Sequence, residues 1–158
     1  MEWMELARML HVLGACVLLG TGAGIAFFML MAHRTAEPAT IAHTASVVVV
    51  ADMIFTATAV VAQPVTGLAL MSHVGWSLTE GWIVLSLVLY VFIGVFWLPV
   101  IFIQVRMRDE AMASASAGEP LTARYHRLYR IWFACGIPAF IAIIILLWLM
   151  IARPAIGS

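Results

Sequence analysis

Four long apolar stretches, separated by short polar segments, dominate the pattern of hydrophobic and polar positions along the chain. They cover about residues 9–32, 47–71, 82–103 and 131–152. Roughly 20 consecutive apolar residues are enough to cross the hydrocarbon of a bilayer as an α-helix, and each stretch reaches that length. The pattern therefore predicts an all-α, four-helix transmembrane bundle with short connections, in a single integral membrane domain over residues 1–158.

Composition supports the membrane assignment and removes several alternatives. Hydrophobic residues make up 65% of the 158 residues and charged residues 10%, with a mean hydropathy of +1.08, whereas an ordinary soluble domain has roughly 25% charged residues. Eight basic residues balance eight acidic ones, so no positive excess favours the binding of nucleic acid. Zinc-protease, phosphate-loop and paired-cysteine metal motifs are absent from the sequence. We therefore expect the lipid bilayer, and no nucleic acid, as a partner.

The basic residues, all of them arginine, are distributed unequally between the connections. The segments after the first and third apolar stretches carry six of the eight: Arg34, Arg106, Arg108, Arg124, Arg127 and Arg130. Because connections rich in arginine stay on the cytoplasmic side, these segments are expected in the cytoplasm. Both termini then lie in the periplasm, and the expected location is a bacterial inner (cytoplasmic) membrane crossed several times.

Small residues and tryptophans indicate how the helices are packed and placed. The spacing of Gly20 and Gly24 predicts a face of the first helix that packs tightly on a neighbour. The alternative is that these glycines clear room for a flat ligand such as a porphyrin. Trp82, Trp132 and Trp148 lie near the ends of the third and fourth stretches, a depth typical of anchors at the membrane interface.

A first group of polar residues lies at a similar depth toward the periplasmic side. Its members are His11, Gln63, Thr66, Ser86 and Tyr90. A neutral imidazole at this depth is able to ligate haem iron or another metal, and the amide and hydroxyl groups are able to line the pocket. The alternative is that His11 is structural and bonds a neighbouring carbonyl group.

A second group lies toward the cytoplasmic side, around the carboxyl group of Asp52. A carboxylate inside a span costs roughly 2.5–3.5 kcal/mol, so Asp52 needs a partner or a proton. We expect a polar network of Asp52 with Gln104 and an arginine that reaches inward, either Arg34, Arg106 or Arg130. A structural ion pair, a proton or cation relay, and a neutral buried carboxyl group are the three interpretations.

Several short motifs are spread over nearly the whole chain. They are Leu10-His11-Val12-Leu13-Gly14, Gly20-Thr21-Gly22, Ala32-His33-Arg34, Ala51-Asp52, Gln63-Pro64 with Gly67, Trp97-Leu98-Pro99 with Gln104, and Gly136-Ile137-Pro138-Ala139-Phe140. In these motifs the chain resembles a bacterial family of four-span integral membrane proteins whose function is not established. The resemblance implies the architecture and no activity.

A second, more distant resemblance rests on four features of the sequence. They are His11 early in the first helix, Gly81-Trp82 at the start of the third, Tyr129-Arg130 at the entry of the fourth, and Pro138 after it. In these features the chain is similar to the HemJ-type protoporphyrinogen oxidases. Their early histidine is tied to haem binding, which the resemblance implies for His11. The lysine that those oxidases carry after Gly-Trp is missing near Ser86, and Ala134-Cys135-Gly136 replaces their acidic residue.

Two functional hypotheses follow. The first is a membrane protein that binds haem b or another porphyrin and uses it in redox chemistry. In this hypothesis His11 is the axial ligand, and Gln63, Ser86 and Tyr90 lie around the ring. The second is a non-enzymatic accessory or assembly subunit, or a small transport component, whose polar residues hold the helices together. Because four spans are few for an independent transporter, the small transport component would need a homodimer or a larger membrane complex.

Overall fold

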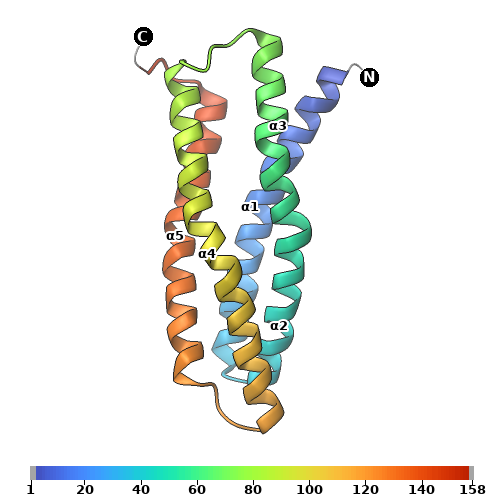
Figure 1. Cartoon of the computed structure of the whole chain (residues 1–158), viewed down its shortest axis with the longest axis vertical. Helices are drawn as coiled ribbons and strands as arrows, with labels where there is room; N and C mark the ends of the chain where they lie inside the picture. Colours follow the sequence, from blue (N-terminus) through green and yellow to red (C-terminus); the bar gives the residue numbers. More distant parts are fainter. Residues whose placement is uncertain (1–2, 157–158) are drawn as a thin grey trace.

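The computed structural model describes residues 3–156, which form helices and turns and no strands (Figure 1). The elements in order are α1 (Trp3–Thr35), α2 (Pro38–Ala51), η1 (Asp52–Thr56), α3 (Ala57–Val74), α4 (Gly81–Ala117) and α5 (Ala123–Ala152). The segments α2, η1 and α3 follow one continuous helical path, so four helices are long and apolar enough to cross a membrane. The predicted all-α, four-helix transmembrane fold is confirmed.

The helices extend well beyond the apolar stretches that predicted them. Helix α4, with 37 residues, is about 55 Å long at a rise of 1.5 Å per residue, whereas the hydrocarbon layer is roughly 30 Å thick. Its polar continuation past Ile103 contains several Ala, Met and Arg residues, which are strong helix formers. The helix ends only at Gly118, whose left-handed backbone (φ 66°) terminates it.

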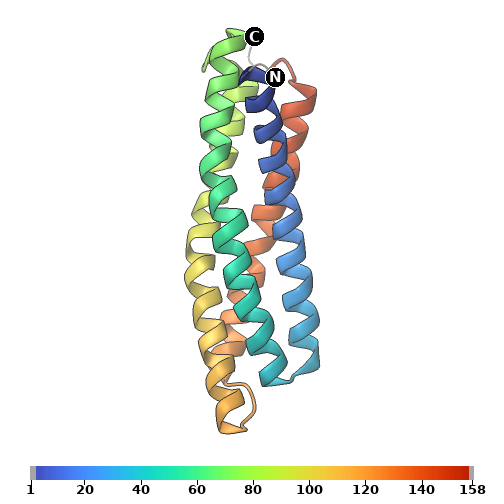
Figure 2. The ribbon, with the colours of Figure 1, turned by 90° about the vertical axis from the view of Figure 1, so that its right-hand side faces the viewer.

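The connections divide the bundle into two ends. The turns at 36–37 and 118–122 lie at one end, here called the arginine end, because six of the arginines lie on the parts of α1, α4 and α5 that lead into or out of these turns. The connection 75–80 lies at the opposite end, where α1 also begins and α5 finishes (Figures 1 and 2). Pro38 starts α2, and Thr122 caps α5 by accepting a hydrogen bond from the Tyr125 backbone N–H at 3.0 Å.

The arginine half of the bundle holds the packed core. There α2 contacts both α1 and α4, and α4 packs along α5. Small side chains on α2, such as Ala42 and Ala45, let the backbones approach closely. At the surface of this core the His33 ring stacks on Tyr129, with ring centroids 3.7 Å apart and planes inclined by 9°. This stack joins the end of α1 to the start of α5.

The other half of the bundle separates into two helix pairs. Beyond η1, α3 packs on α1, while α4 continues along α5 (Figure 1). Among residues 3–156, α3 does not pack along α4, and the Tyr90 hydroxyl donates a hydrogen bond to the Val60 carbonyl between these helices. The two pairs therefore leave space between them near the middle of the bundle.

Candidate functional site

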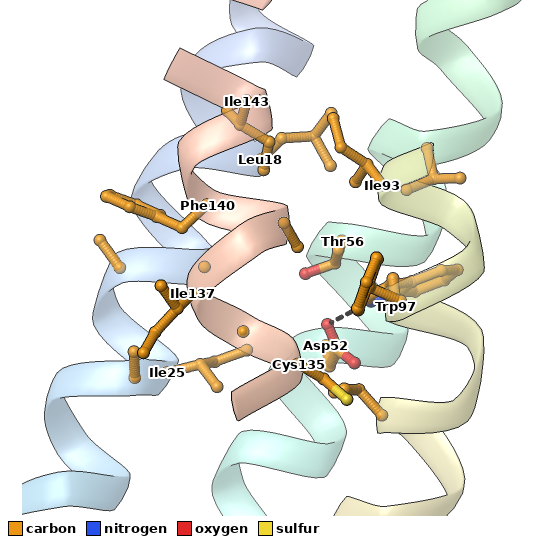
Figure 3. A pocket seen from close by; sticks show the side chains of 18 of the residues that line it. Leu18, Ile25, Asp52, Thr56, Ile93, Trp97, Cys135, Ile137, Phe140 and Ile143 are labelled. Carbon is orange, nitrogen blue, oxygen red and sulfur yellow. Dashed lines mark hydrogen bonds between the residues drawn. The ribbon is translucent and has the colours of Figure 1, made fainter. Parts of the chain in front are cut away.

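A cavity of about 480 Å³ lies between the two helix pairs (Figure 3). Ligand pockets in proteins occupy roughly 300–1,000 Å³, so this volume suits a small molecule. All the long helices contribute to the lining, which is predominantly apolar and aromatic. The polar side chains that line it are those of Asp52, Thr56, Gln63, Tyr90 and Gln104.

Small residues on α1 and α5 keep the cavity open. Gly22 lines it from α1 and Gly136 from α5, and a Cβ atom added at either position would meet no heavy atom within 4 Å. The predicted close packing of Gly20 and Gly24 is wrong. An added Cβ has nothing within 4 Å at Gly20, and at Gly24 it meets only Phe28 of the same helix. These glycines stand where helices are apart.

The floor of the cavity, toward the arginine end, is a hydrogen-bonded cluster around Asp52. The Trp97 indole N–H donates to Asp52 Oδ1 at 3.3 Å, as Figure 3 shows. With its amide oriented to satisfy both neighbours, Gln104 donates from Nε2 to Asp52 Oδ2 at 3.1 Å and accepts from the Trp132 indole at 3.2 Å. Helix α4 thus supplies both neutral donors to a carboxyl group that is only 3% exposed, and Trp132 of α5 supports one of them by donating to Gln104.

The local backbone places a second polar group beside this carboxyl group. Segment η1 is one π-helical turn, in which the Ala57 N–H bonds to the Asp52 carbonyl, and such turns occur frequently at functional sites. Asp52 and Thr56, at its two ends, both lie against the cavity (Figure 3). The Thr56 hydroxyl is buried beside the Asp52 carboxyl group and makes no hydrogen bond to any other described residue.

The arginine partner expected for Asp52 is not found. In the described part of the chain, the ion pairs are Arg108 with Asp109 and Arg124 with Glu110, both outside the apolar stretches. The side chains of Arg34, Arg106 and Arg130 are exposed. The physical reason is depth: the helix that carries Asp52 begins at Pro38 rather than near residue 47, which puts Asp52 about 21 Å along it. Of the predicted network, only the Asp52 and Gln104 pair is formed.

His11 lies in a separate contact between α1 and α3. The Thr66 hydroxyl donates to the Ala62 carbonyl at 2.7 Å and lies 2.8 Å from His11 Nδ1, so this nitrogen is the donor to Thr66. The Gln63 amide donates to the His11 carbonyl at 2.7 Å. We call this contact, with Gly14 and Gly67, the α1–α3 clasp. His11 does not belong to the cavity lining among the residues described.

The clasp explains two glycines that the sequence motifs contain. A Cβ at Gly14 would overlap the Gln63 amide, and one at Gly67 would lie 3.1 Å from His11 Cε1. The two glycines thus leave the space in which the Gln63 amide and the His11 ring lie between α1 and α3.

The other predicted pocket residues are divided between the cavity and the helix contacts. Gln63 and Tyr90 line the cavity. Ser86 is buried and donates to the Trp82 carbonyl at 2.7 Å on its own helix, and it is outside the lining within residues 3–156. The structure thus separates the four predicted ligand-binding residues rather than gathering them around one ring.

Sequence reasoning missed the two tryptophans of the cavity floor. Trp132, predicted as an interfacial anchor, is 5% exposed and bonded to Gln104. Trp97 was noted only as part of the motif Trp97-Leu98-Pro99. Because a buried indole N–H needs an acceptor and the apolar stretches offer few, its position inside an apolar stretch was a signal that it bonds to one of their polar side chains. Thr56 and Cys135, which also line the cavity, carried no comparable signal.

The comparisons with known proteins identify a family without an activity. The family described as "Predicted integral membrane protein (DUF2269)" matches residues 5–154. No curated protein and no solved structure matches the chain significantly. The comparisons give no support to the similarity with the HemJ-type oxidases.

Proposed function

Since the chain belongs to this family of integral membrane proteins, described by its location alone, we propose that it binds a mostly apolar small molecule inside the bilayer. The observation that carries the proposal is the central cavity, with its apolar walls and its polar floor at Asp52 and Thr56. A concave apolar site with a few convergent polar groups is the usual form of a small-molecule site. The apolar walls hold the body of the ligand and the floor orients its polar group.

The position of the cavity at the middle of the bundle indicates how a ligand enters it. The cavity is lined by residues of α1 and α5 that lie within the apolar stretches, such as Leu18, Ile137 and Phe140 (Figure 3). A ligand of this site enters from the hydrocarbon of the bilayer rather than from water. Lipid-soluble molecules therefore form the candidate class, and a porphyrin is one member of it.

Haem ligation by His11 is the form of this proposal that the geometry disfavours. The His11 ring packs over Gly67 in the α1–α3 clasp, and its side chain is outside the cavity lining among the described residues. A porphyrin inside the cavity would find ligating atoms on Asp52, Tyr90 and Cys135 instead. We therefore propose no axial role for His11, and a Soret absorption band that is lost in His11→Ala with the fold intact would contradict this.

Orientation and location complete the proposal. The six arginines at one end of the bundle and the two near the other support an arginine end in the cytoplasm of a bacterial cell, with both termini periplasmic. Ligand exchange by this protein would then take place in the inner membrane, with Asp52 nearer to the cytoplasmic side of the cavity. A homodimer or larger membrane complex is compatible with this arrangement, since the exposed outer surfaces of the helices are apolar.

Native mass spectrometry of the purified protein tests the proposal with two matched variants of α1. Gly22→Leu fills the cavity, whereas Gly20→Leu places the same side chain two residues away, outside the lining; neither added Cβ meets an atom within 4 Å. We expect wild type and Gly20→Leu to retain a small molecule that Gly22→Leu has lost. The mass and absorption spectrum of the bound molecule then identify its class.

Identical spectra without any bound molecule in all three proteins would contradict a binding function. They would favour the alternative of an accessory or assembly subunit, whose polar residues serve only to hold the helices together.

A further inference from the structure

Among residues 3–156, the carboxyl group of Asp52 has no countercharge. Its hydrogen-bond donors, the Trp97 indole and the Gln104 amide, are both neutral. The basic residues are all arginines, and within residues 3–156 none forms an ion pair with it. With 3% of its surface exposed, Asp52 is also shielded from water. When ionised, this group therefore depends on a positive charge that comes from outside the chain.

The surroundings of Asp52 favour an organic cation over a metal ion. A hard metal cation needs several oxygen ligands, and the described residues contain no cluster of three metal-binding side chains. Aromatic side chains instead lie along the lining, among them Phe96, Trp97, Trp132 and Phe133. Aromatic rings attract cations over their faces and bind the apolar parts of an organic ligand at the same time.

We propose, building on the function proposed above, that the ligand is a lipophilic organic cation whose charged group pairs with Asp52 while its apolar body fills the cavity. The Thr56 hydroxyl, buried beside Asp52, has an oxygen that accepts any N–H that the charged group carries. A buried carboxylate without a partner carries a free-energy penalty, and the cation removes it. The protein thus selects ligands by charge as well as by apolar surface.

The test compares two probes of nearly the same size and shape and opposite charge, tetraphenylphosphonium and tetraphenylborate. Binding of each to the full-length protein in phosphatidylcholine nanodiscs is measured by equilibrium dialysis. We expect the phosphonium ion to bind at least about tenfold more tightly than the borate. In Asp52→Asn the affinity for the phosphonium ion falls by roughly 10- to 100-fold, which is the loss expected when a buried contact to a charged group is removed.

Three further variants make the result specific. Asp52→Glu keeps the negative charge and retains selective binding of the phosphonium ion. Asp109→Asn removes an exposed carboxyl group outside the apolar stretches and leaves its affinity unchanged, which separates a cavity effect from attraction to the surface. Gly22→Leu, which keeps the floor and fills the space above it, lowers the affinity for the phosphonium ion even if Asp52→Asn does not fold.

The outcomes distinguish this inference from the function on which it rests. Equal affinity for the two ions in the wild type, or an unchanged affinity in a folded Asp52→Asn variant, overturns the cation inference. If the mass spectra show that the wild type retains a neutral molecule that Gly22→Leu lacks, the binding function stands with an uncharged ligand. If neither ion binds and no molecule is retained, both proposals fail together.

Discussion

Single residues on α1 meet opposite requirements in this bundle. At Gly14 the absence of a side chain allows α3 to approach, whereas at Gly22 it leaves the cavity open. The spacing of glycines in the sequence predicted a packed face, but it did not show which glycine contacts a helix. That distinction depends on where α3 diverges from α4, which is a property of the assembled bundle. The chemistry of His11 was similarly uncertain from sequence, because a histidine that ligates a metal and one that joins two helices look alike.

Gly14→Ala should destabilise the bundle, because the added methyl group displaces the Gln63 amide from its hydrogen bond to the His11 carbonyl in the clasp. Overpacking of this kind costs about 1–3 kcal/mol, so the free energy of unfolding in mixed detergent micelles should fall by that amount. Gly20→Ala is the matched control, since its methyl group meets no neighbour and alanine favours helix formation. Equal stabilities of the two variants would contradict the close approach at Gly14.

At the scale of the elements, hydropathy located the four helices well and their ends poorly. The second helix was predicted over residues 47–71 and occupies 38–74, interrupted by the π-helical turn η1. Hydropathy reports which residues prefer lipid, and a helix continues into polar sequence until a residue such as Gly118 ends it. The misplaced start of the second helix led directly to the wrong expectation of an arginine partner for Asp52. The π-helical turn has no sequence signal of its own.

The site itself was predictable in part. Asp52 and Gln104 were recognised as a polar pair because polar residues are rare within spans, and Gln63 and Tyr90 do line the cavity. The pairing of Asp52 with Trp97 and of Gln104 with Trp132 was not predictable. It depends on the relative rotation of α4 and α5 against η1, which only the assembled fold determines.

At the scale of the whole molecule, the arrangement of charge and space defines a direction across the membrane. The packed core and the arginines lie in one half, and the cavity extends into the other. The bundle is thus tightly packed toward the arginine end. From η1 toward the connection 75–80, the cavity separates the two helix pairs. A ligand bound at Asp52 would be separated from the arginine end by the packed core.

Single cysteines at the two ends test the proposed orientation. In a chain with Cys16→Ser and Cys135→Ser, the exposed positions Ser77 and Ser116 lie at opposite ends. A membrane-impermeant maleimide added to cells with a permeabilised outer membrane should label Ser77→Cys, in the connection 75–80. Ser116→Cys should react only after the inner membrane is broken. The reverse pattern would place the arginine end in the periplasm.

The central claim is that a lipid-soluble ligand occupies the space between the two helix pairs. The most direct measurement is the electron density of crystals grown from a lipid phase, without removal of molecules that copurify. We expect α3 and α4 to lie apart beyond η1, with non-protein density that runs between α1 and α5 and ends at Asp52 and Thr56. Helix α3 packed along α4, with Asp52 paired to an arginine and no space beside it, would contradict a ligand site in this bundle.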